Sequence, residues 1–449
     1  MQDVFAHIDA NANEYVERLR RLVRQPSVAA QGRGIKEALA IVTELAEGAG
    51  ATVEHVPTSG NPVMWADFGG AGTQVVNLYN HYDVQPEDPV DLWLSDPFDV
   101  DLRDGVLYGR GVADDKGFLV GRLCAIDAWR QVRGELPLRL RMAAEGEEEI
   151  GSPHLGEFVT TWEARLREAD VCVWEGSEKN LGGLVEIQLG GKGLLYVEFR
   201  AHGPGHDAHS MYGGILPNPA WALVRVLSRL VDEEGRVQIP GFYDDVREPD
   251  EALLELVDRL PFDEPEEMRA HEVARWARGL TGRPLVRELL LAPTSNIAGL
   301  HSGYGGEGAK TVLPAEAMLK MDFRLVPEQD PEKIAAALGK WLDDNGFGDI
   351  EVRTLAQQRP SRGRADHPAL AALVEAGHQV GLTCVVSPNS AGTGPIYDMC
   401  DRLGLSMVTG ESVARTDALI HAPNEHIMLD DYISGIKHFA AFLDVYSRS

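Results

Sequence analysis

The sequence predicts an α/β protein in which helices flank a mixed sheet and a smaller α+β unit interrupts the chain. In the first 190 residues, apolar runs of strand length alternate with segments of helical periodicity. The pattern changes at Gly190-Gly191-Lys192-Gly193, and a return linker is expected at 360–364. We therefore expect a main domain made of residues 1–190 and 362–449, with residues 191–361 as an insert.

The elements of the main domain follow from apolar spacing and from helix and strand ends. Apolar residues recur at helical spacing from Val4 to Val23, and Pro26 ends that pattern. A second helix is expected from Gly34 to Gly48. Strands are then expected at 52–56, 63–68, 75–79, 138–143 and 170–174, with helices at 118–132, 367–380 and 432–446. In sheets of this kind, functional groups collect at the carboxyl ends of the strands.

The insert has a different pattern of predicted elements, with longer strands and a strongly acidic connecting segment. Strands are expected at 194–201, 317–325 and 353–358, a helix at 219–231, and an acidic region at 243–267. Strands and helices that alternate over so short a segment favour a compact α+β unit.

Composition excludes several classes of protein. The 449 residues carry a net charge of -28, which argues against binding to nucleic acid or to anionic membrane surfaces. The four cysteines are scattered without a CxxC pair, so neither a zinc ribbon nor a disulfide framework is predicted. Because no stretch is apolar over a spanning length and the N-terminus lacks a signal-peptide pattern, we expect a cytoplasmic protein.

A histidine and two aspartates mark the first candidate site. His81 and Asp83 are two residues apart at the end of the strand at 75–79, so their side chains lie on the same face. Asp83 can then hold one imidazole nitrogen while the other nitrogen faces a metal ion. Asp114 lies in a glycine-containing loop before a helix and can offer its two oxygens to two cations. Either piece alone would equally fit a capping arrangement.

Three later segments add acids and a second histidine. The run from Glu145 to Glu149 follows the strand at 138–143, and Glu175 follows the strand at 170–174. Four carboxylates within five residues are costly unless positive charge offsets them, although a solvated acidic turn is the simplest alternative. His421 stands between an apolar segment and a proline, where a lone histidine is usually structural.

Taken together, these residues form a ligand set for two metal ions. His81 and Glu175 can bind one metal, Glu149 and His421 the other, and Asp114 can bridge them. Mixed histidine and carboxylate ligands suit zinc, manganese or cobalt. A water between the two metals would become more acidic, and Glu148 is placed to act as its general base.

The motifs that carry this set resemble those of a known family. In order, they are HYD, YGRGVADDKG, EGEEEIGS, the strand-end acid Glu175 and HAPNE. This series resembles the zinc-dependent aminoacylase and carboxypeptidase family, which includes acetylornithine deacetylase and succinyl-diaminopimelate desuccinylase. The phrases HYDVQP, GAKTVLP and FRLVP are most similar to the carnosinase and cytosolic non-specific dipeptidase branch.

The resemblance implies roles for the insert and for further residues. It implies that the main domain is catalytic and that the insert is a lid through which two copies form a homodimer. His209 would enter the partner subunit's site and polarise the scissile carbonyl, and Arg324 would bind the substrate's carboxylate. Thr311 and Thr393 would make smaller polar contacts, and the Asp114–Asp115 peptide would be cis.

The predicted function is therefore that of a two-metal exopeptidase. Its substrates would be dipeptides or short peptides with a free C-terminal carboxylate, cleaved by a metal-activated water. The alternative is an amidohydrolase of the same fold that deacylates N-acyl amino acids. Glu175 keeps this alternative open, because the dipeptidase branch usually has an aspartate there and deacylases often have a glutamate.

Overall fold

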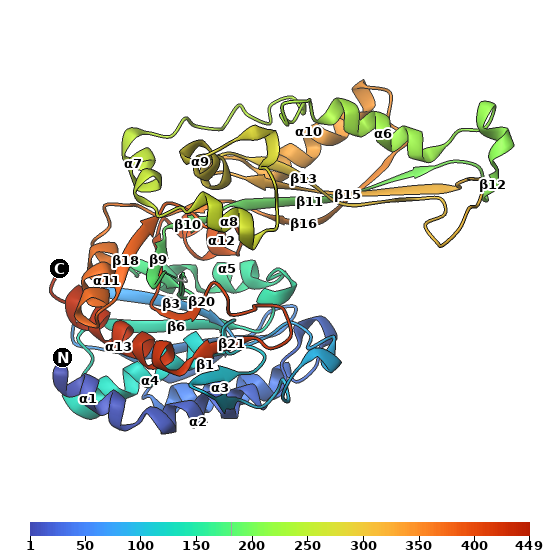
Figure 1. Cartoon of the computed structure of the whole chain (residues 1–449). Helices are drawn as coiled ribbons and strands as arrows, with labels where there is room; N and C mark the ends of the chain where they lie inside the picture. Colours follow the sequence, from blue (N-terminus) through green and yellow to red (C-terminus); the bar gives the residue numbers. More distant parts are fainter. Residues whose placement is uncertain (181) are drawn as a thin grey trace. The chain divides into compact units, whose positions relative to one another are not determined.

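The computed structural model describes residues 1–180 and 182–449, which form two compact units (Figure 1). The first contains Met1–Gly190, Arg362–Pro388 and Pro395–Ser449; the second contains Gly191–Ser361 and Asn389–Gly394. The segment Asn389–Gly394 thus lies with the second unit, whereas the sequence assigned it to the main domain. Hydrogen bonds explain this: the Lys192 amide donates to the Ser390 carbonyl at 3.3 Å.

A six-stranded mixed sheet forms the centre of the first unit, as the α/β prediction requires. Its order is β1 (Thr52–Val56), β2 (Val63–Gly69), β6 (Arg139–Glu145), β3 (Val75–His81), β7 (Val171–Trp174) and β19 (Ser406–Thr409). The strands β6, β3, β7 and β19 run parallel, so their carboxyl ends meet at one edge. All seven residues of β3 are buried, as expected for a strand with neighbours and helices on both sides.

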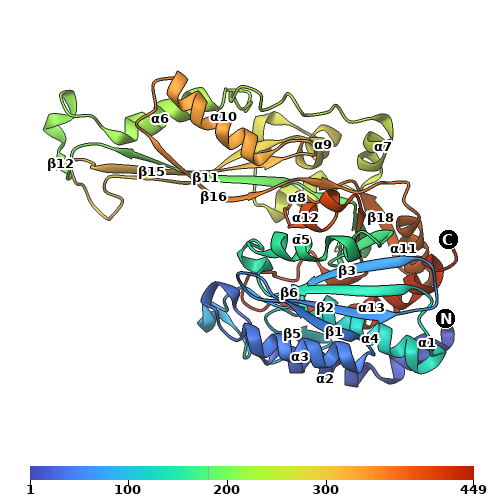
Figure 2. The same cartoon turned by 180° about the vertical axis from the view of Figure 1, so that it is seen from behind.

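Helices cover both faces of this sheet (Figure 2). α5 (Leu155–Leu166) and α12 (Ile396–Met399) share one apolar core with the sheet. α3 (Ile35–Gly48), α4 (Lys116–Arg133), α11 (Pro368–Gln379) and α13 (Leu429–Tyr446) complete the unit, together with two N-terminal helices. Within the described part of the chain, no helix is both long enough and apolar enough to cross a membrane.

Two features of the first unit differ from the sequence expectation. The sequence predicts one N-terminal helix, whereas the structure has two, α1 (Gln2–Ala10) and α2 (Ala12–Val23). They break at Asn11, whose backbone leaves the helical region and whose side-chain amide donates to the His7 carbonyl at 2.8 Å. Helix α5 was not predicted.

Short strands complete the first unit. A four-stranded sheet has the order β18 (Thr383–Ser387), β9 (Leu184–Gln188), β8 (Ser177–Lys179) and β20 (Ser412–Arg415). A three-stranded sheet has the order β21 (His426–Met428), β5 (Val106–Tyr108) and β4 (Asp101–Arg103). The loops between β20 and β21 and between β5 and α4 are therefore anchored next to each other by the pairing of β21 with β5.

The second unit is an α+β layer pair. Its antiparallel sheet has the order β13 (Thr294–Ser302), β15 (Glu316–Leu325), β11 (Gly193–His202) and β16 (Glu351–Gln358). Residues of β15 alternate between buried and partly exposed, and the buried ones pack under α6 (Pro219–Leu230) and α10 (Pro331–Asp344) (Figure 1). The acidic region contains α7 (Glu251–Arg259) and α8 (Glu264–Ala270), and α9 (Arg283–Leu291) follows. Neither α9, α10 nor β13 was predicted.

One buried histidine of the first unit links its stability to pH. His438 of α13 has no exposed surface, and its Nε2 lies 2.9 Å from the Leu373 carbonyl of α11. Its Nδ1 is buried without a partner. Burial lowers the pKa of His438 to about 4. The folded protein therefore holds the neutral ring at a pH where the unfolded chain binds a proton.

We predict that His438→Gln removes part of the acid sensitivity of the protein. The depressed pKa of His438 costs the wild type stability as pH falls through 6.5, and the loss is complete below about 4. Between pH 7 and pH 5 this amounts to about 2 kcal/mol of the free energy of unfolding. Urea unfolding at both pH values measures it. His378→Gln, at an exposed position of α11, is the control and keeps the wild-type dependence; an equal dependence in His438→Gln would contradict the prediction.

Candidate metal centre

The candidate site lies at the carboxyl ends of the parallel strands. His81 is the last residue of β3, and Glu175 directly follows β7. Glu148 and Glu149 begin a short 3-10 turn three residues after β6 ends at Glu145. Because these three strands are parallel neighbours, residues distant in sequence come together at one edge.

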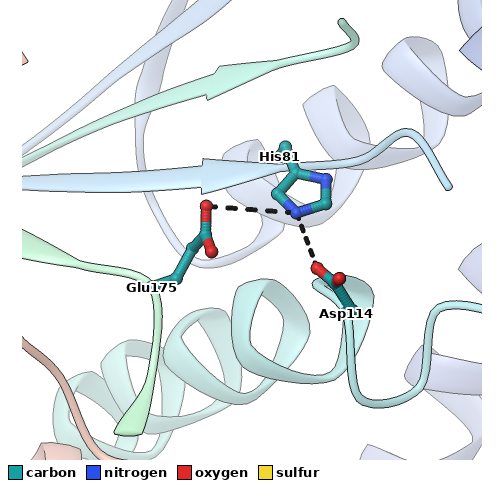
Figure 3. A group of neighbouring side chains, drawn as sticks. All are labelled: His81, Asp114 and Glu175. Carbon is teal, nitrogen blue, oxygen red and sulfur yellow. Dashed lines mark hydrogen bonds and ion pairs between the residues drawn. The ribbon is translucent and has the colours of Figure 1, made fainter. Parts of the chain in front are cut away.

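The first ligand group consists of His81, Asp114 and Glu175 (Figure 3). The fully buried His81 ring has its Nε2 2.9 Å from Asp114 Oδ1 and 4.0 Å from Glu175 Oε1. One donor atom of each residue lies within 4.8 Å of the others, so one cation could contact all three.

The second ligand group consists of Asp114, Glu149 and His421. His421 Nε2 lies 3.1 Å from Asp114 Oδ2 and 3.1 Å from Glu149 Oε2. Gln85 donates to Glu149 Oε2 at 2.8 Å and orients that carboxylate. Asp114 therefore belongs to both groups and turns one oxygen toward each histidine.

Asp83 supports both groups without belonging to either. Its Oδ1 lies 3.4 Å from His81 Nδ1, while its backbone carbonyl lies 3.1 Å from the same nitrogen. The two carboxylate oxygens also accept the backbone N–H groups of Glu148 and Glu149 at 3.2 Å and 3.0 Å. A single carboxylate thus fixes a ring on β3 and the turn after β6. The Asp114–Asp115 peptide is cis, as predicted.

Few positively charged groups offset the acidic residues of the site. Burial raises the pKa of Glu175 well above its usual range and raises that of Asp115 to about 7. Burial opposes ionisation of Asp114 too, but contacts with His421 and His81 hold its pKa well below the usual range. Glu175 Oε1 is buried without a hydrogen-bond partner. Divalent cations fit this cluster, because they would supply the missing charge and occupy that free oxygen.

Glu148 has a carboxyl group with a strongly raised pKa. Burial raises the pKa of its carboxyl group, His81 opposes this effect, and Asp114 and Glu149 add to it, which together bring the pKa to about 8. A carboxyl group in this range exchanges its proton near neutral pH, as a general base requires.

Two buried ion pairs at the site were missed by the sequence analysis. Arg122 of α4 pairs with Glu411 at 3.0 Å, and Arg110 pairs with Glu425 at 2.8 Å. Arg110 and Glu425 stand inside the motifs YGRGVADDKG and HAPNE, so those motifs held the signal for the second pair. Glu411 lies in the two-residue connection between β19 and β20, and no motif indicated it or Arg122.

The remaining predicted residues lie in the second unit as two separate pairs. Arg324 donates to Thr393 Oγ1 at 2.8 Å, near the carboxyl end of β15. His209 pairs in register with Val312, beside Thr311, in the two-stranded ladder that precedes β15. Arg324 is eight residues beyond the first residue of β15, a rise of roughly 26 Å along the extended strand, and Thr311 precedes that first residue.

Comparisons with known proteins agree on one family. The model of peptidase family M20/M25/M40 matches residues 77–445. A Cys-Gly metallodipeptidase, DUG1 of Candida albicans, is 28% identical over 491 residues, covering 100% of this chain and 98% of its own. The human Beta-Ala-His dipeptidase is 28% identical over 471 residues, covering 98% of this chain and 92% of its own.

A solved structure shows the same likeness over the whole fold. The M20 family metallo-carboxypeptidase Sso-CP2 from Sulfolobus solfataricus superposes with a TM-score of 0.92 at 36% identity. The match covers 97% of this chain and 100% of that chain. Both units of this chain therefore have counterparts in that structure.

We predict that divalent cations stabilise the first unit through this cluster. At a thousandfold excess over the dissociation constant, one bound Zn²⁺ adds about 4 kcal/mol to the free energy of unfolding. The melting temperature of chelator-treated protein should rise on addition of Zn²⁺, and His421→Ala should reduce that rise. Glu351→Gln, beside the exposed His202 of the second unit, is the control and keeps the full rise. An unchanged melting temperature in the wild type would rule the site out.

Proposed function

This chain belongs to peptidase family M20/M25/M40, and we propose that it is a two-metal exopeptidase that cleaves dipeptides or short peptides. The substrate would carry a free C-terminal carboxylate. One observation carries this proposal: Asp114 turns its two oxygens toward His81 and His421, which belong to two separate ligand groups. The dipeptidase relatives support the choice of substrate class.

The proposed ligands divide between two cations. His81 and Glu175 would hold one, Glu149 and His421 the other, and Asp114 both. Mixed nitrogen and oxygen donors favour zinc, with manganese and cobalt as alternatives. When bound, divalent cations supply positive charge that polarises a carbonyl group and makes water more acidic.

The protein's own residues would then transfer the protons. Glu148 takes a proton from the attacking water and returns it to the amine that leaves. Asp83 holds both His81 and Glu148 in place, because its carboxylate contacts the His81 ring and accepts the backbone N–H of Glu148. His209 would donate to the carbonyl oxygen as negative charge develops there.

The substrate contacts support a homodimer. Arg324 would bind the terminal carboxylate with a bidentate fork, held in place by its hydrogen bond to Thr393. His209 and Thr311 lie beside the start of β15, and the strand rises roughly 26 Å from its first residue to Arg324, a longer span than a dipeptide covers. Both pairs can contact one small substrate only if one pair comes from a second copy. We therefore propose that His209 acts in the partner's site.

The competing function is deacylation of N-acyl amino acids. Glu175 favours it, because a glutamate at this position is frequent among the deacylases that the sequence resembles. The substrates of the two functions differ in the group on the N-terminal side of the scissile bond. A dipeptide presents a free amino group, whereas an N-acyl amino acid presents an acyl chain.

We predict that metal-free protein reconstituted with Zn²⁺, Mn²⁺ or Co²⁺ hydrolyses Ala-Ala-type dipeptides faster than N-acetyl amino acids. The measurement is kcat/KM for each substrate with each metal, and blocking the C-terminal carboxylate should raise KM through loss of the Arg324 contact. Arg353→Gln, which alters an exposed arginine on strand β16 of the same sheet, is the control. Preference for the N-acetyl series would favour the deacylase; activity on neither, with metal bound, would contradict both.

We predict that two inactive variants complement each other. His209→Ala removes one oxyanion donor, which costs on the order of a hundred- to a thousandfold in rate, and Glu148→Gln removes the base. Both should keep wild-type metal content. In a random mixture, half the dimers are mixed and each has one intact site, giving about a quarter of wild-type activity. Differently tagged, co-expressed chains allow this test. No recovery in purified mixed dimers would place His209 outside the partner's site.

A further inference from the structure

Two separate buried ion pairs contact the segments that carry the candidate metal centre. Arg122 and Glu411 are 0% and 2% exposed, and Arg110 and Glu425 are 1% and 0% exposed. Buried ion pairs are often no more stabilising than apolar residues of similar size, because both charges lose their hydration. The role of these two pairs is therefore better understood from the other hydrogen bonds that the four side chains make.

The pair Arg122–Glu411 holds the strands that carry the first group. Besides Glu411, the Arg122 guanidinium donates to the Tyr79 carbonyl at 2.9 Å and to Asn80 Oδ1 at 2.8 Å, and it also donates to the Trp174 carbonyl. Asn80 directly precedes His81, and Trp174 directly precedes Glu175. One guanidinium thus fixes the ends of both β3 and β7. Gly410 leaves the space, because a side chain there would collide with Arg122.

The pair Arg110–Glu425 holds the two loops that carry the second group. The Glu425 carboxylate accepts the backbone N–H groups of Gly111 at 2.9 Å, Ala113 at 2.8 Å and Asp114 at 3.1 Å. Arg110 Nη2 also donates to the Ala422 carbonyl at 3.4 Å, next to His421. The pair therefore fixes the loop of Asp114 against the loop of His421.

A second observation shows that the His421 loop needs this support. Leu419, His421 and Asn424 have φ angles of 56°, 63° and 66°, in the left-handed region that non-glycine residues seldom adopt. Asn424 also bonds reciprocally to the loop before β4: Leu94 N–H donates to its Oδ1 at 2.8 Å, and its Nδ2 donates to the Leu92 carbonyl at 2.9 Å. These contacts with other segments stabilise a loop conformation that its own residues disfavour.

We propose that Glu411 and Glu425 are positioning residues that set the affinities of the two cation sites separately. Glu411, through Arg122, fixes His81 and Glu175. Glu425, with Arg110, fixes Asp114 against His421. This inference rests on the proposed two-metal function. It adds that the two halves of the centre can be weakened one at a time, although Asp114 is common to both.

The test is cation binding by Glu411→Gln and Glu425→Gln, without reference to turnover. Calorimetric titration of chelator-treated protein with Zn²⁺ gives two affinities, and ¹¹³Cd NMR assigns each site through the resonance lost in Glu175→Gln or in Glu149→Gln. Changes beyond the direct ligands typically weaken metal binding 10- to 100-fold. We expect Glu411→Gln to weaken the His81–Asp114–Glu175 site by about that factor, and Glu425→Gln the Asp114–Glu149–His421 site. The other site in each variant should be weakened less, because only Asp114 is common to both sites.

Three further variants serve as controls. Glu54→Gln breaks an exposed ion pair with Arg165 of the same unit and should change neither affinity. If a single variant fails to fold, Arg122→Met/Glu411→Gln and Arg110→Met/Glu425→Gln remove both charges and leave no unpaired guanidinium. Equal weakening of both sites in either variant, or no change in both, would overturn the proposal. If the wild type itself bound no cation, the proposed function would fall instead.

Discussion

The crowding of carboxyl groups in a buried space is the constraint on which this structure depends. Asp83, Asp114, Asp115, Glu148, Glu149 and Glu175 surround two histidines at the edge of the parallel strands. Burial disfavours the ionised forms of Glu148, Glu175 and Asp115 and raises their pKa values. Bound divalent cations would offset this crowding of carboxyl groups, which supports the proposed metal centre.

The fold meets this constraint by keeping the ligands rigid. Parallel strands bring His81, Glu149 and Glu175 to one edge, while Asp83 ties the turn after β6 to the histidine. Arginines sit directly behind the acidic cluster and contact backbone carbonyls and supporting carboxylates rather than the proposed ligands. Positive charge therefore stabilises the surroundings, and the ligand oxygens stay available to a cation.

Local patterns predicted the central strands closely, because apolar runs bounded by polar strand ends determine both position and type. The ligand set was also visible, since every member lies in a short motif. Arg122 and Glu411 were not, because their pairing depends on tertiary contact between segments 289 residues apart. The break at Asn11 and the transfer of Asn389–Gly394 to the second unit likewise depend on individual hydrogen bonds that periodicity cannot detect. The separation of His209 from Arg324 required the register of the sheet.

The insertion of the second unit has a consequence for biosynthesis. During translation, residues 1–190 emerge with β3, β6 and β7, but β19, Glu411 and His421 follow only after the whole of Gly191–Ser361. Until those residues have been synthesised, Arg122 lacks the Glu411 carboxylate that pairs with it, and the acidic cluster lacks the His421 ring. The inserted unit, by contrast, has an apolar core of its own and can fold ahead of the centre that its chain interrupts. The candidate centre can therefore be completed only after the inserted unit has been synthesised.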